Sequence, residues 1–259
     1  TQRNVLRNVD SNFLITDNAV LSDLINGKSS FKIGDIACCV TGFYSGDDKH
    51  YLHPISEEIR NAKRYTTVLP EVIHTGILTE DEKTTGITGD RFMVPIVKGG
   101  NKQYTKPDEW FMDWSAKAVS EYRKSRKCRF QNSKFYFKQG IAVPMVRSGQ
   151  LTAALINNRL FDQSIVGIFP HDNRWLLYLL GFLNSRACSH AINLINPSTN
   201  NSANYIKQLP VIKPTKEDFV EVTSIVTRLV EKENQDSFQL SQDRLNAIFD
   251  RMYDFQLLK

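Results

Sequence analysis

Short apolar runs separated by turn residues dominate the chain up to about residue 214, which is the pattern of strands in a folded domain. The run at 92–97 (FMVPIV) is continuously apolar and predicts a strand buried on both faces. Residues 33–40 and 141–146 (IAVPMV) predict two further strands, and 151–169 predicts more strands and turns. The pattern therefore indicates a sheet-rich core.

Helical spacing appears in three parts of the chain. Residues 55–64 and 175–195 each predict one helix. After Thr215, with Asp218 three residues later as in a capping box, apolar residues repeat at helical spacing. A polar gap at 231–237 separates this stripe from a second one. Such stripes are typical of helices that pack into a core or against another helix.

Length and composition allow this pattern to form a real core. The chain has 259 residues, of which 41% are hydrophobic and 24% are charged, so it is not typical of a disordered protein. We expect a mixed α/β (α+β) fold, with a mixed or mostly antiparallel sheet in a domain over residues 1–214. A helical region over 215–259 would pack on that domain or on a partner domain.

Charge and cysteine usage narrow the class of protein. The formal net charge of +5 permits an anionic partner without requiring one. Four cysteines show no paired metal-ligand spacing and indicate reduced thiols. The N-terminus has no signal-peptide pattern, and Asn184, Arg186 and His190 interrupt the most apolar helix. We expect a soluble, cytoplasmic protein without membrane contact.

The strand at 92–97 leads into a basic turn at 98–101 (KGGN), which is followed by Lys102. Paired glycines let a ligand approach the backbone closely, and the lysines supply positive charge, a combination that suits a phosphate group. Aromatic residues follow between 104 and 114. The alternative is an ordinary hairpin turn that happens to be basic, because Gly-Gly-Asn is common turn chemistry.

Residues 117–138 hold the strongest local positive charge, with eight Lys or Arg residues and a single acid, Glu121. Alternation within 134–138 (KFYFK) predicts a strand that buries both phenylalanines and presents the lysines and the tyrosine outward. Basic residues interleaved with aromatics are typical of nucleic-acid-binding surfaces, although a charge run is commonly only a solvated face.

Two polar segments follow apolar elements, at 147–149 (RSG) and at 198–204 (STNNSAN). Asparagine and serine at this density could supply the donors and acceptors that read base edges. They could equally cap a helix and start the next element. The sequence leaves both interpretations open.

Recognisable catalytic motifs are missing from the sequence. There is no phosphate-binding glycine loop, no nucleophile elbow and no nuclease-like arrangement of carboxylates. His50 and His53, with two aspartates nearby, lack a further ligand at suitable spacing, so we expect no metal site. Binding is favoured over catalysis, and the pattern does not decide whether the chain is an enzyme. A nuclease lobe with an unrecognised site and a protein-interaction module that docks through the terminal helices remain alternatives.

Five segments, taken in order, resemble the motifs of one family. They are 34–52 (its TG-N-x-x-F loop), 94–114 (its KGG…Y…W segment), 132–146 (its N-x-x-Y-F-x-x-G-I strand pair), 179–212 (its LLG-x-LNS…NPT…LP helix and loop) and 248–257 (its closing helix). The family is the C-terminal target-recognition region of adenine-specific DNA methyltransferases. It includes type IIG and type IIL restriction–modification enzymes, phage-exclusion (BREX) methyltransferases and TaqI-like specificity domains.

The sequence departs from the family pattern at Ser45, Asp47 and Pro144. It also lacks the Asn-Pro-Pro-Tyr/Phe catalytic loop and the glycine motif that binds S-adenosylmethionine. The resemblance therefore implies a bacterial DNA-recognition domain that serves phage defence by restriction–modification. Its partners would be double-stranded DNA and a methyltransferase catalytic domain, in the same or a separate chain. S-adenosylmethionine would belong to the parent enzyme, with no cofactor and no catalytic residue in this chain.

The resemblance implies roles for individual residues. The expected DNA contacts are Lys98, Gly99, Gly100, Asn101, Lys102, Arg126, Lys134, Tyr136, Lys138, Arg147, Ser148 and Asn200. The lysines and Arg126 would meet phosphates, whereas Asn101, Arg147, Ser148 and Asn200 would read base edges. A loop of Tyr44, Ser45, Gly46, Asp47 and Lys49 would face the catalytic domain or a flipped base.

Overall fold

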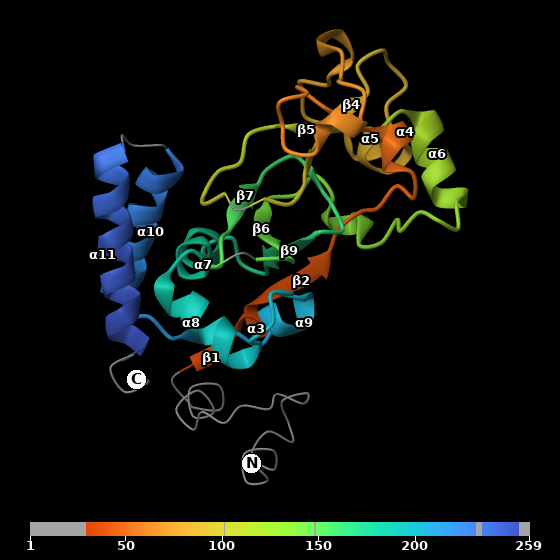
Figure 1. Cartoon of the computed structure of the whole chain (residues 1–259). Helices are drawn as coiled ribbons and strands as arrows, with labels where there is room; N and C mark the ends of the chain where they lie inside the picture. The colour runs from red at the N-terminus through yellow and green to blue at the C-terminus, as the bar shows by residue number, and fades with distance from the viewer. Residues whose placement is uncertain (1–29, 101, 148, 232–234, 254–259) are drawn as a thin grey trace.

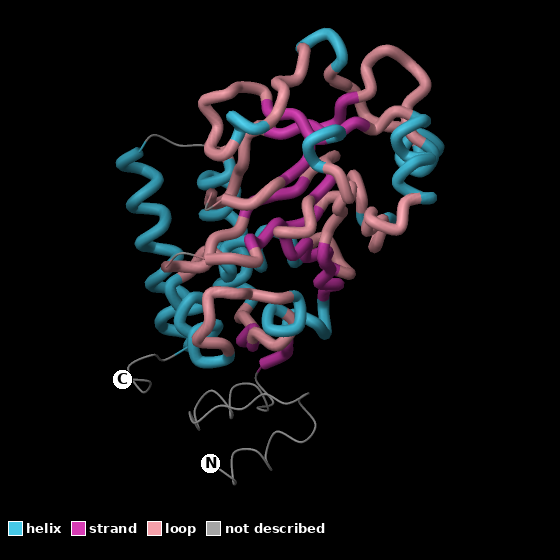
Figure 2. Tube along the Cα trace, turned by 45° about the vertical axis from the view of Figure 1, so that its right-hand side comes forward, coloured by secondary structure: helices cyan, strands magenta, loops and turns pink. Residues whose placement is uncertain are grey.

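The computed structural model describes residues 30–100, 102–147, 149–231 and 235–253 of the protein. Asn101 and Ser148, both expected to contact DNA, lie outside this part of the chain. The strands run through the middle of the molecule, between the long helices on one side and loop-rich segments at the top (Figure 2). The expected mixed α+β fold, with antiparallel and mixed sheets and C-terminal helices, is confirmed.

A central antiparallel sheet has the strand order β2-β9-β6-β7 (Figure 1). Its strands are β2 (Ala37–Thr41), β6 (Gly140–Pro144), β7 (Ala154–Ile156) and β9 (Ile165–Pro170). Successive residues of β6 enter different hydrophobic clusters, with Ile141 and Val143 in one and Ala142 in the other. Because side chains alternate along a strand, this sheet separates two cores.

A second sheet lies in the upper part of Figure 1 and has the order β3-β5-β4-β8, with β4 and β8 parallel. Its strands are β3 (Leu52–Pro54), β4 (Met93–Val97), β5 (Trp110–Asp113) and β8 (Leu160–Phe161). The helices of this upper part are α4 (Asp48–Tyr51), α5 (Glu80–Thr85) and α6 (Ala116–Lys124), with the 3₁₀ turns η1 (Ala62–Arg64) and η2 (Pro70–Val72). A ribbon of β1 (Ser30–Lys32) and β10 (Pro210–Ile212) forms beside α3 (Ile33–Ile36) and α9 (Ala203–Ile206).

The strand predictions hold best where the apolar run is continuous. The predicted strand at 92–97 is β4, four of whose five residues are buried. The prediction at 141–146 corresponds to β6, which ends at Pro144. The prediction at 33–40 is correct only in its second half, because Ile33 and Gly34 donate to backbone carbonyls of Leu209 and Lys207 in a helical turn.

The single helix predicted over 175–195 is instead two helices, α7 (Trp175–Leu183) and α8 (Arg186–Ile195). Asn184 interrupts them, since its amide donates to Ala153 O at 2.8 Å and its Oδ1 accepts from Ala153 N at 2.9 Å. Ser185 then caps α8 by accepting from Cys188 N at 3.1 Å. The buried side chains of Asn184 and Ser185 therefore end α7 and begin α8, where the apolar pattern predicted one continuous helix.

The helix predicted over 55–64 is wrong except at its end, where Ala62–Arg64 form the 3₁₀ turn η1. Ile55 N donates to Glu109 O at 2.9 Å, so the chain continues its pairing with the segment before β5. Asn61, with φ of 68°, adopts the left-handed conformation, which a continuing right-handed helix does not allow.

The strand predicted over 134–138 is also wrong. Residues Ser133–Phe135 form the 3₁₀ turn η3, and Phe137 has a φ of 60°. Tyr136 is only 3% exposed, packs beside Trp114 and donates to Gln131 O at 2.5 Å. Lys134 and Lys138 are exposed as predicted, but the tyrosine predicted to lie beside them is in the core.

The two C-terminal helices, α10 (Lys216–Val230) and α11 (Gln235–Tyr253), agree with the sequence prediction. Thr215 caps α10 by accepting from Asp218 N at 3.0 Å. Their apolar residues belong to the same buried cluster as Ile141, and Tyr253 donates to Pro210 O at 2.6 Å. The stripes are therefore buried in the chain's own core.

Helix α7 packs closely against α10 at Gly181, where an added Cβ would lie 2.7 Å from Val226 Cγ2. We expect Gly181→Ala to lower the free energy of unfolding by about 1–2 kcal/mol, because overpacking outweighs the gain in helix propensity. Gly89→Ala is the matched control, since no atom lies within 4 Å of an added Cβ there. Urea denaturation measures both, and an increase in stability for Gly181→Ala would contradict tight packing between α7 and α10.

Candidate functional site

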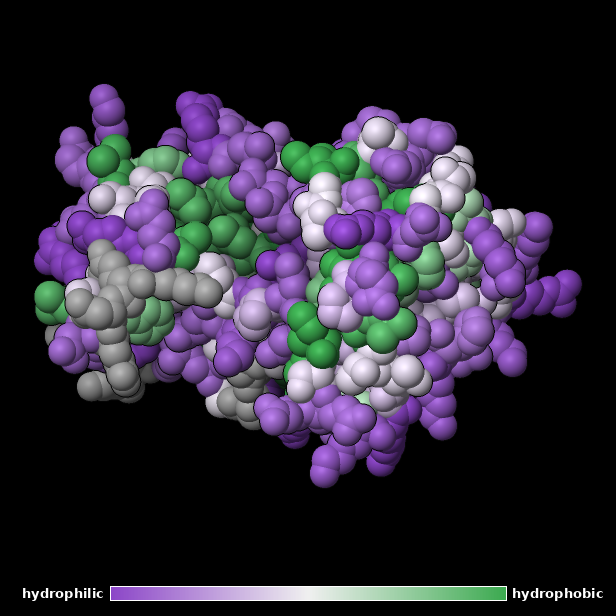
Figure 3. Space-filling view, turned by 90° about the horizontal axis from the view of Figure 1, so that it is seen from above, coloured by the Kyte–Doolittle hydropathy of each residue, from purple (hydrophilic) through white to green (hydrophobic). Residues whose placement is uncertain are grey.

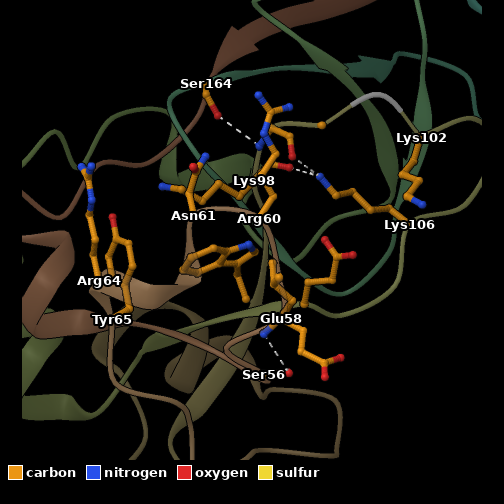
Figure 4. A pocket seen from close by; sticks show the side chains of 15 residues that line it. Ser56, Glu58, Arg60, Asn61, Arg64, Tyr65, Lys98, Lys102, Lys106 and Ser164 are labelled. Carbon is orange, nitrogen blue, oxygen red and sulfur yellow. Dashed lines mark hydrogen bonds between the residues drawn. The ribbon is translucent and has the colours of Figure 1, made fainter.

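A hollow of about 950 Å³ opens in the upper part of the molecule where three segments meet. The 56–65 segment lies on one side, the 98–110 segment on the other, and Ser164 at the edge (Figure 4). Five basic residues line it, Arg60, Arg64, Lys98, Lys102 and Lys106, against two acids, Glu58 and Glu109. The hollow therefore suits an anionic ligand.

The basic turn predicted from the sequence forms one wall of this hollow. Gly99 N donates to Ser164 Oγ at 3.3 Å, and the Lys106 ammonium donates to the carbonyl oxygens of Lys98 and Gly99. Gly100 has a φ of 124°, which only glycine adopts without strain, and a Cβ there would lie 3.3 Å from Lys106 Nζ. The turn is thus built around a buried amine.

Lys98 is held by two carboxylates. Its Nζ lies 3.2 Å from Asp48 Oδ2 and 3.5 Å from Asp162 Oδ2, and 5.8 Å from the centre of the Trp110 ring. Burial alone would lower the pKa of Lys98, but Asp162 and Asp48 together raise it above its ordinary value. Because its charge is already compensated, Lys98 is less suited to a phosphate contact than the sequence indicated.

Lys106 is a different kind of cation, only 7% exposed, and among the described residues no carboxylate is bonded to its amine. Burial lowers the pKa of Lys106 to about 8, with Lys102 and Arg159 adding to the effect and Glu109 opposing it. Its own carbonyl accepts from Arg159 Nη1 at 2.6 Å, and Arg159 pairs with Asp108 at 2.9 Å. The backbone at Lys106 is therefore tied to Arg159.

The Tyr44–Lys49 loop borders a separate, smaller hollow of about 470 Å³. Ser45 Oγ donates to Asp48 Oδ1 at 2.7 Å, and Gly46, with φ of 82°, packs on the backbone of Lys127. Across it Tyr51 donates to Glu121 Oε2 at 2.5 Å, a hydrogen bond that raises the pKa of Tyr51 to about 12. Since Asp48 also pairs with Lys98, the loop and the basic turn are physically linked.

The remaining predicted cations do not line the first hollow. Arg126, Lys134 and Lys138 are exposed on the segment after α6, and Lys134 lies over the ring of Phe135 at 5.2 Å. Of the predicted DNA contacts, the hollow brings together Lys98, Gly99, Gly100 and Lys102. Arg126, Lys134 and Lys138 lie outside it.

Arg147 is not a surface residue, contrary to the prediction that it reads base edges. It is 6% exposed, and its Nη2 donates to the carbonyl oxygens of Asn196 and Ser198 at 3.0 Å each. Both acceptors belong to the loop after α8, so these hydrogen bonds connect Arg147 to that loop. Asn200, which pairs with Val146 in an isolated bridge, is exposed as predicted.

Several lining residues escaped the sequence prediction, namely Arg60, Asn61, Arg64 and Lys106. The basic pattern at 60–64 (RNAKR) was a usable signal, but a helix prediction there concealed it. No sequence pattern indicated that Lys106 is buried. Its burial depends on contacts with the carbonyls of Lys98 and Gly99 and with Arg159, which lies 53 residues away.

Among the described residues, no group of three or more His, Cys, Asp or Glu could hold a metal ion, and all four cysteines carry free thiols. No described helix has the length and apolar character needed to cross a bilayer.

Comparison with known proteins finds sequence similarity to a methyltransferase. Over 164 residues, 60% of this chain, the sequence is 27% identical to the adenine-specific methyltransferase PglX of Lacticaseibacillus casei (strain Zhang), and it covers 14% of that protein. The chain is similar to part of an adenine-specific methyltransferase. No family model matches it.

Two solved structures resemble the fold. The type IIL restriction–modification enzyme MmeI, whose structure was determined in complex with DNA, superimposes with a TM-score of 0.53 and 12% identity over 88% of this chain and 35% of MmeI. The type IIG restriction endonuclease BpuSI gives a TM-score of 0.43 and 10% identity over 91% of this chain and 33% of BpuSI. The chain thus has the fold of a part of MmeI and spans only a minor share of PglX and of MmeI. The expected similarity to adenine-specific methyltransferases is confirmed at the level of sequence, whereas the likeness to MmeI concerns the fold alone.

We expect Lys98→Met to lower the free energy of unfolding by about 2 kcal/mol, because it leaves the buried carboxylate of Asp162 without its cation. Since the pKa of Lys98 is raised in the folded state, the ion pairs stabilise the protein through neutral pH and lose effect only as pH rises past that value. Urea denaturation at neutral pH measures the change.

Lys102→Met is the control, as Lys102 is exposed, and its stability should stay within about 0.5 kcal/mol of the wild type. Equal stability of the Lys98 and Lys102 variants would show that the ion pairs contribute little.

Proposed function

We propose that this protein recognises double-stranded DNA sequences for an adenine-specific DNA methyltransferase of a restriction–modification system. It would position the target adenine for methyl transfer from S-adenosylmethionine. The transfer would take place in a catalytic domain outside these residues, in the same or a separate chain. This separation suits base-modifying enzymes, because the active site holds only the extruded base. The sequence that flanks this base must then be recognised by another part of the protein.

The cationic hollow carries the proposal. Arg60, Arg64 and Lys102 are exposed at its rim, and the glycine turn beside them lets a sugar–phosphate chain approach the backbone. Phosphate contacts of this kind fix a duplex in register without reading its sequence. The hollow has the sign of charge that DNA requires, and its walls come from rigidly bonded segments.

Roles for the other residues follow from their exposure. Lys134, Lys138 and Arg126 would meet phosphates further along the duplex, and exposed Asn200 would read a base edge. Lys98 is assigned to holding the turn, whereas Tyr136 and Arg147 are assigned to the core. The Tyr44–Lys49 loop would contact the catalytic domain or the extruded base.

The comparisons support this proposal from a separate direction. The sequence resembles part of a protein named as an adenine-specific methyltransferase, and the fold resembles part of an enzyme solved with DNA. The hollow itself does not suit S-adenosylmethionine, because five basic side chains would repel the cofactor's sulfonium. The cofactor is therefore assigned to the catalytic domain.

Lys102→Met should weaken binding to any duplex by roughly three- to tenfold and make the salt slope of log K less negative by about 0.9, because one phosphate contact is lost. Fluorescence-anisotropy titrations at several salt concentrations measure both quantities. Lys216→Met, an exposed lysine on α10, is the matched control and should change neither. Identical slopes for the wild type and the Lys102 variant would count against the hollow as the DNA site.

Sequence recognition needs its own test. Selection of bound duplexes from a random pool should enrich one short sequence, because base-edge contacts discriminate by about 1–3 kcal/mol per base pair. Binding without enrichment would mean that the protein grips only the DNA backbone, and the recognition role would then be rejected.

A further inference from the structure

The segment between β3 and β4 reaches the top of the molecule in Figure 1, and the surface seen from above is largely hydrophilic, with small apolar areas between (Figure 3). Within this segment, residues 55–68 form a loop that is closed at its base. Ile55 N donates to Glu109 O at 2.9 Å at one end. Val68 N donates to Pro54 O at 2.8 Å at the other. Both ends of the loop are therefore fixed beside the upper sheet.

The inner side chains of this loop hold its backbone in one shape. Ala62 is fully buried, and the Tyr65 ring packs edge-on against Trp110 with 5.1 Å between the ring centres. Ala62 N donates to Ile59 O at 2.9 Å, and Tyr65 N donates to Ala62 O at 2.8 Å. A loop anchored in this way presents its outward side chains in fixed positions, which recognition of a base requires.

Three asparagines in the described part of the chain adopt the left-handed conformation, Asn61 with φ of 68°, Asn132 with 60° and Asn158 with 51°. Two of them use the side-chain amide inside the protein. Asn132 Nδ2 donates to Thr41 O at 2.9 Å, and Asn158 Nδ2 donates to Gly76 O at 3.2 Å. Asn61 is exposed in the wall of the cationic hollow (Figure 4), and its amide has no hydrogen-bond partner among the described residues. The amide of Asn61 is therefore available to a ligand.

The chemistry of Asn61 differs from that of its neighbours in the loop. Arg60 precedes it and Arg64 follows it, and the proposed function assigns both of these exposed cations to phosphates. A neutral amide gains little from the charge of a phosphate, but it presents an acceptor and a donor side by side. This pair matches the N6 amine and the N7 atom on the major-groove edge of adenine.

We infer that Asn61 is a specificity-determining residue that reads the major-groove edge of an adenine, an inference that rests on the proposed function. Its Oδ1 accepts from the N6 amine of the adenine, and its Nδ2 donates to N7. Arg60 and Arg64 hold the loop against the phosphates. This adenine is a flanking base of the recognised sequence, because the base that is methylated is taken out of the helix by the catalytic domain.

The test selects bound duplexes from a random pool with the wild type, Asn61→Gly and Asn158→Gly. Glycine adopts the left-handed backbone without strain, so each change removes only the side chain. The wild type and Asn158→Gly should enrich the same sequence. Asn61→Gly should lose adenine at one position, where a preference of roughly 5- to 150-fold disappears.

Anisotropy titrations separate base recognition from binding strength. On the duplex that the wild type enriches, Asn61→Gly should bind more weakly by the same factor. On an unrelated duplex its affinity and salt slope should equal those of the wild type, because the amide meets no phosphate, and this equality also shows that the variant is folded. An equal loss on both duplexes, or a changed salt slope, would mean that Asn61 supports the loop or contacts a phosphate, and the inference would be overturned.

A second substitution at the same position removes only the donor. Asn61→Asp keeps the size of the side chain, but its carboxylate repels adenine N7 and accepts from the N4 amine of cytosine. The selected sequence should therefore lose its adenine and favour cytosine there. Retention of adenine by either Asn61 variant overturns the inference alone. If the wild type enriches no sequence, the proposed function fails and the inference fails with it.

Discussion

The molecule depends on two strands that are buried on both faces. Alternate residues of β6 and β9 enter different cores: Ile168 packs toward the long helices, whereas Phe169 packs toward the upper aromatic cluster. A strand of this kind cannot slip by one residue without exchanging the contents of both cores, so its register is strongly specified. The upper sheet, which carries the cationic hollow, is thereby fixed relative to the helices, and the basic residues of the hollow, which come from distant segments, share one support.

Two of the five cations of the hollow are bonded within the protein, and the other three are exposed at its rim. Lys98 is paired with Asp48 and Asp162, and the Lys106 amine is hydrogen-bonded to two carbonyl oxygens. The exposed cations at the rim are Arg60, Arg64 and Lys102. Buried charges need partners, and here those partners shape the backbone that exposed charges stand on. A count of lysines and arginines in the sequence therefore overstates the charge available to a ligand. Their placement on either side of the turn matters more than their number.

The sequence predicted correctly those elements that depend on a local motif or on a long periodic pattern of apolar residues. Strand β4, the cap at Thr215 and both terminal helices followed from apolar runs and spacing, and the basic turn was found from its glycines. Five alternating residues at 134–138 could not distinguish a strand from an irregular aromatic segment, since Tyr136 is drawn into the core by Trp114. The burial of Arg147 depends on the carbonyl of Asn196, 49 residues away, and no local pattern reports such a contact. Lys106 bonds carbonyls only seven and eight residues earlier, but neither apolar spacing nor charge pattern indicates that a lysine is buried there.

The ion pair between Lys98 and Asp48 joins two segments that lie 50 positions apart in the chain. Neither segment is an independent module. Replacing the Tyr44–Lys49 loop by the loop of a homologue without Asp48 would leave Lys98 paired with Asp162 alone. Such a graft therefore requires a matching change at Lys98. Natural recombination faces the same restriction, so variation at these two places should be inherited as a pair.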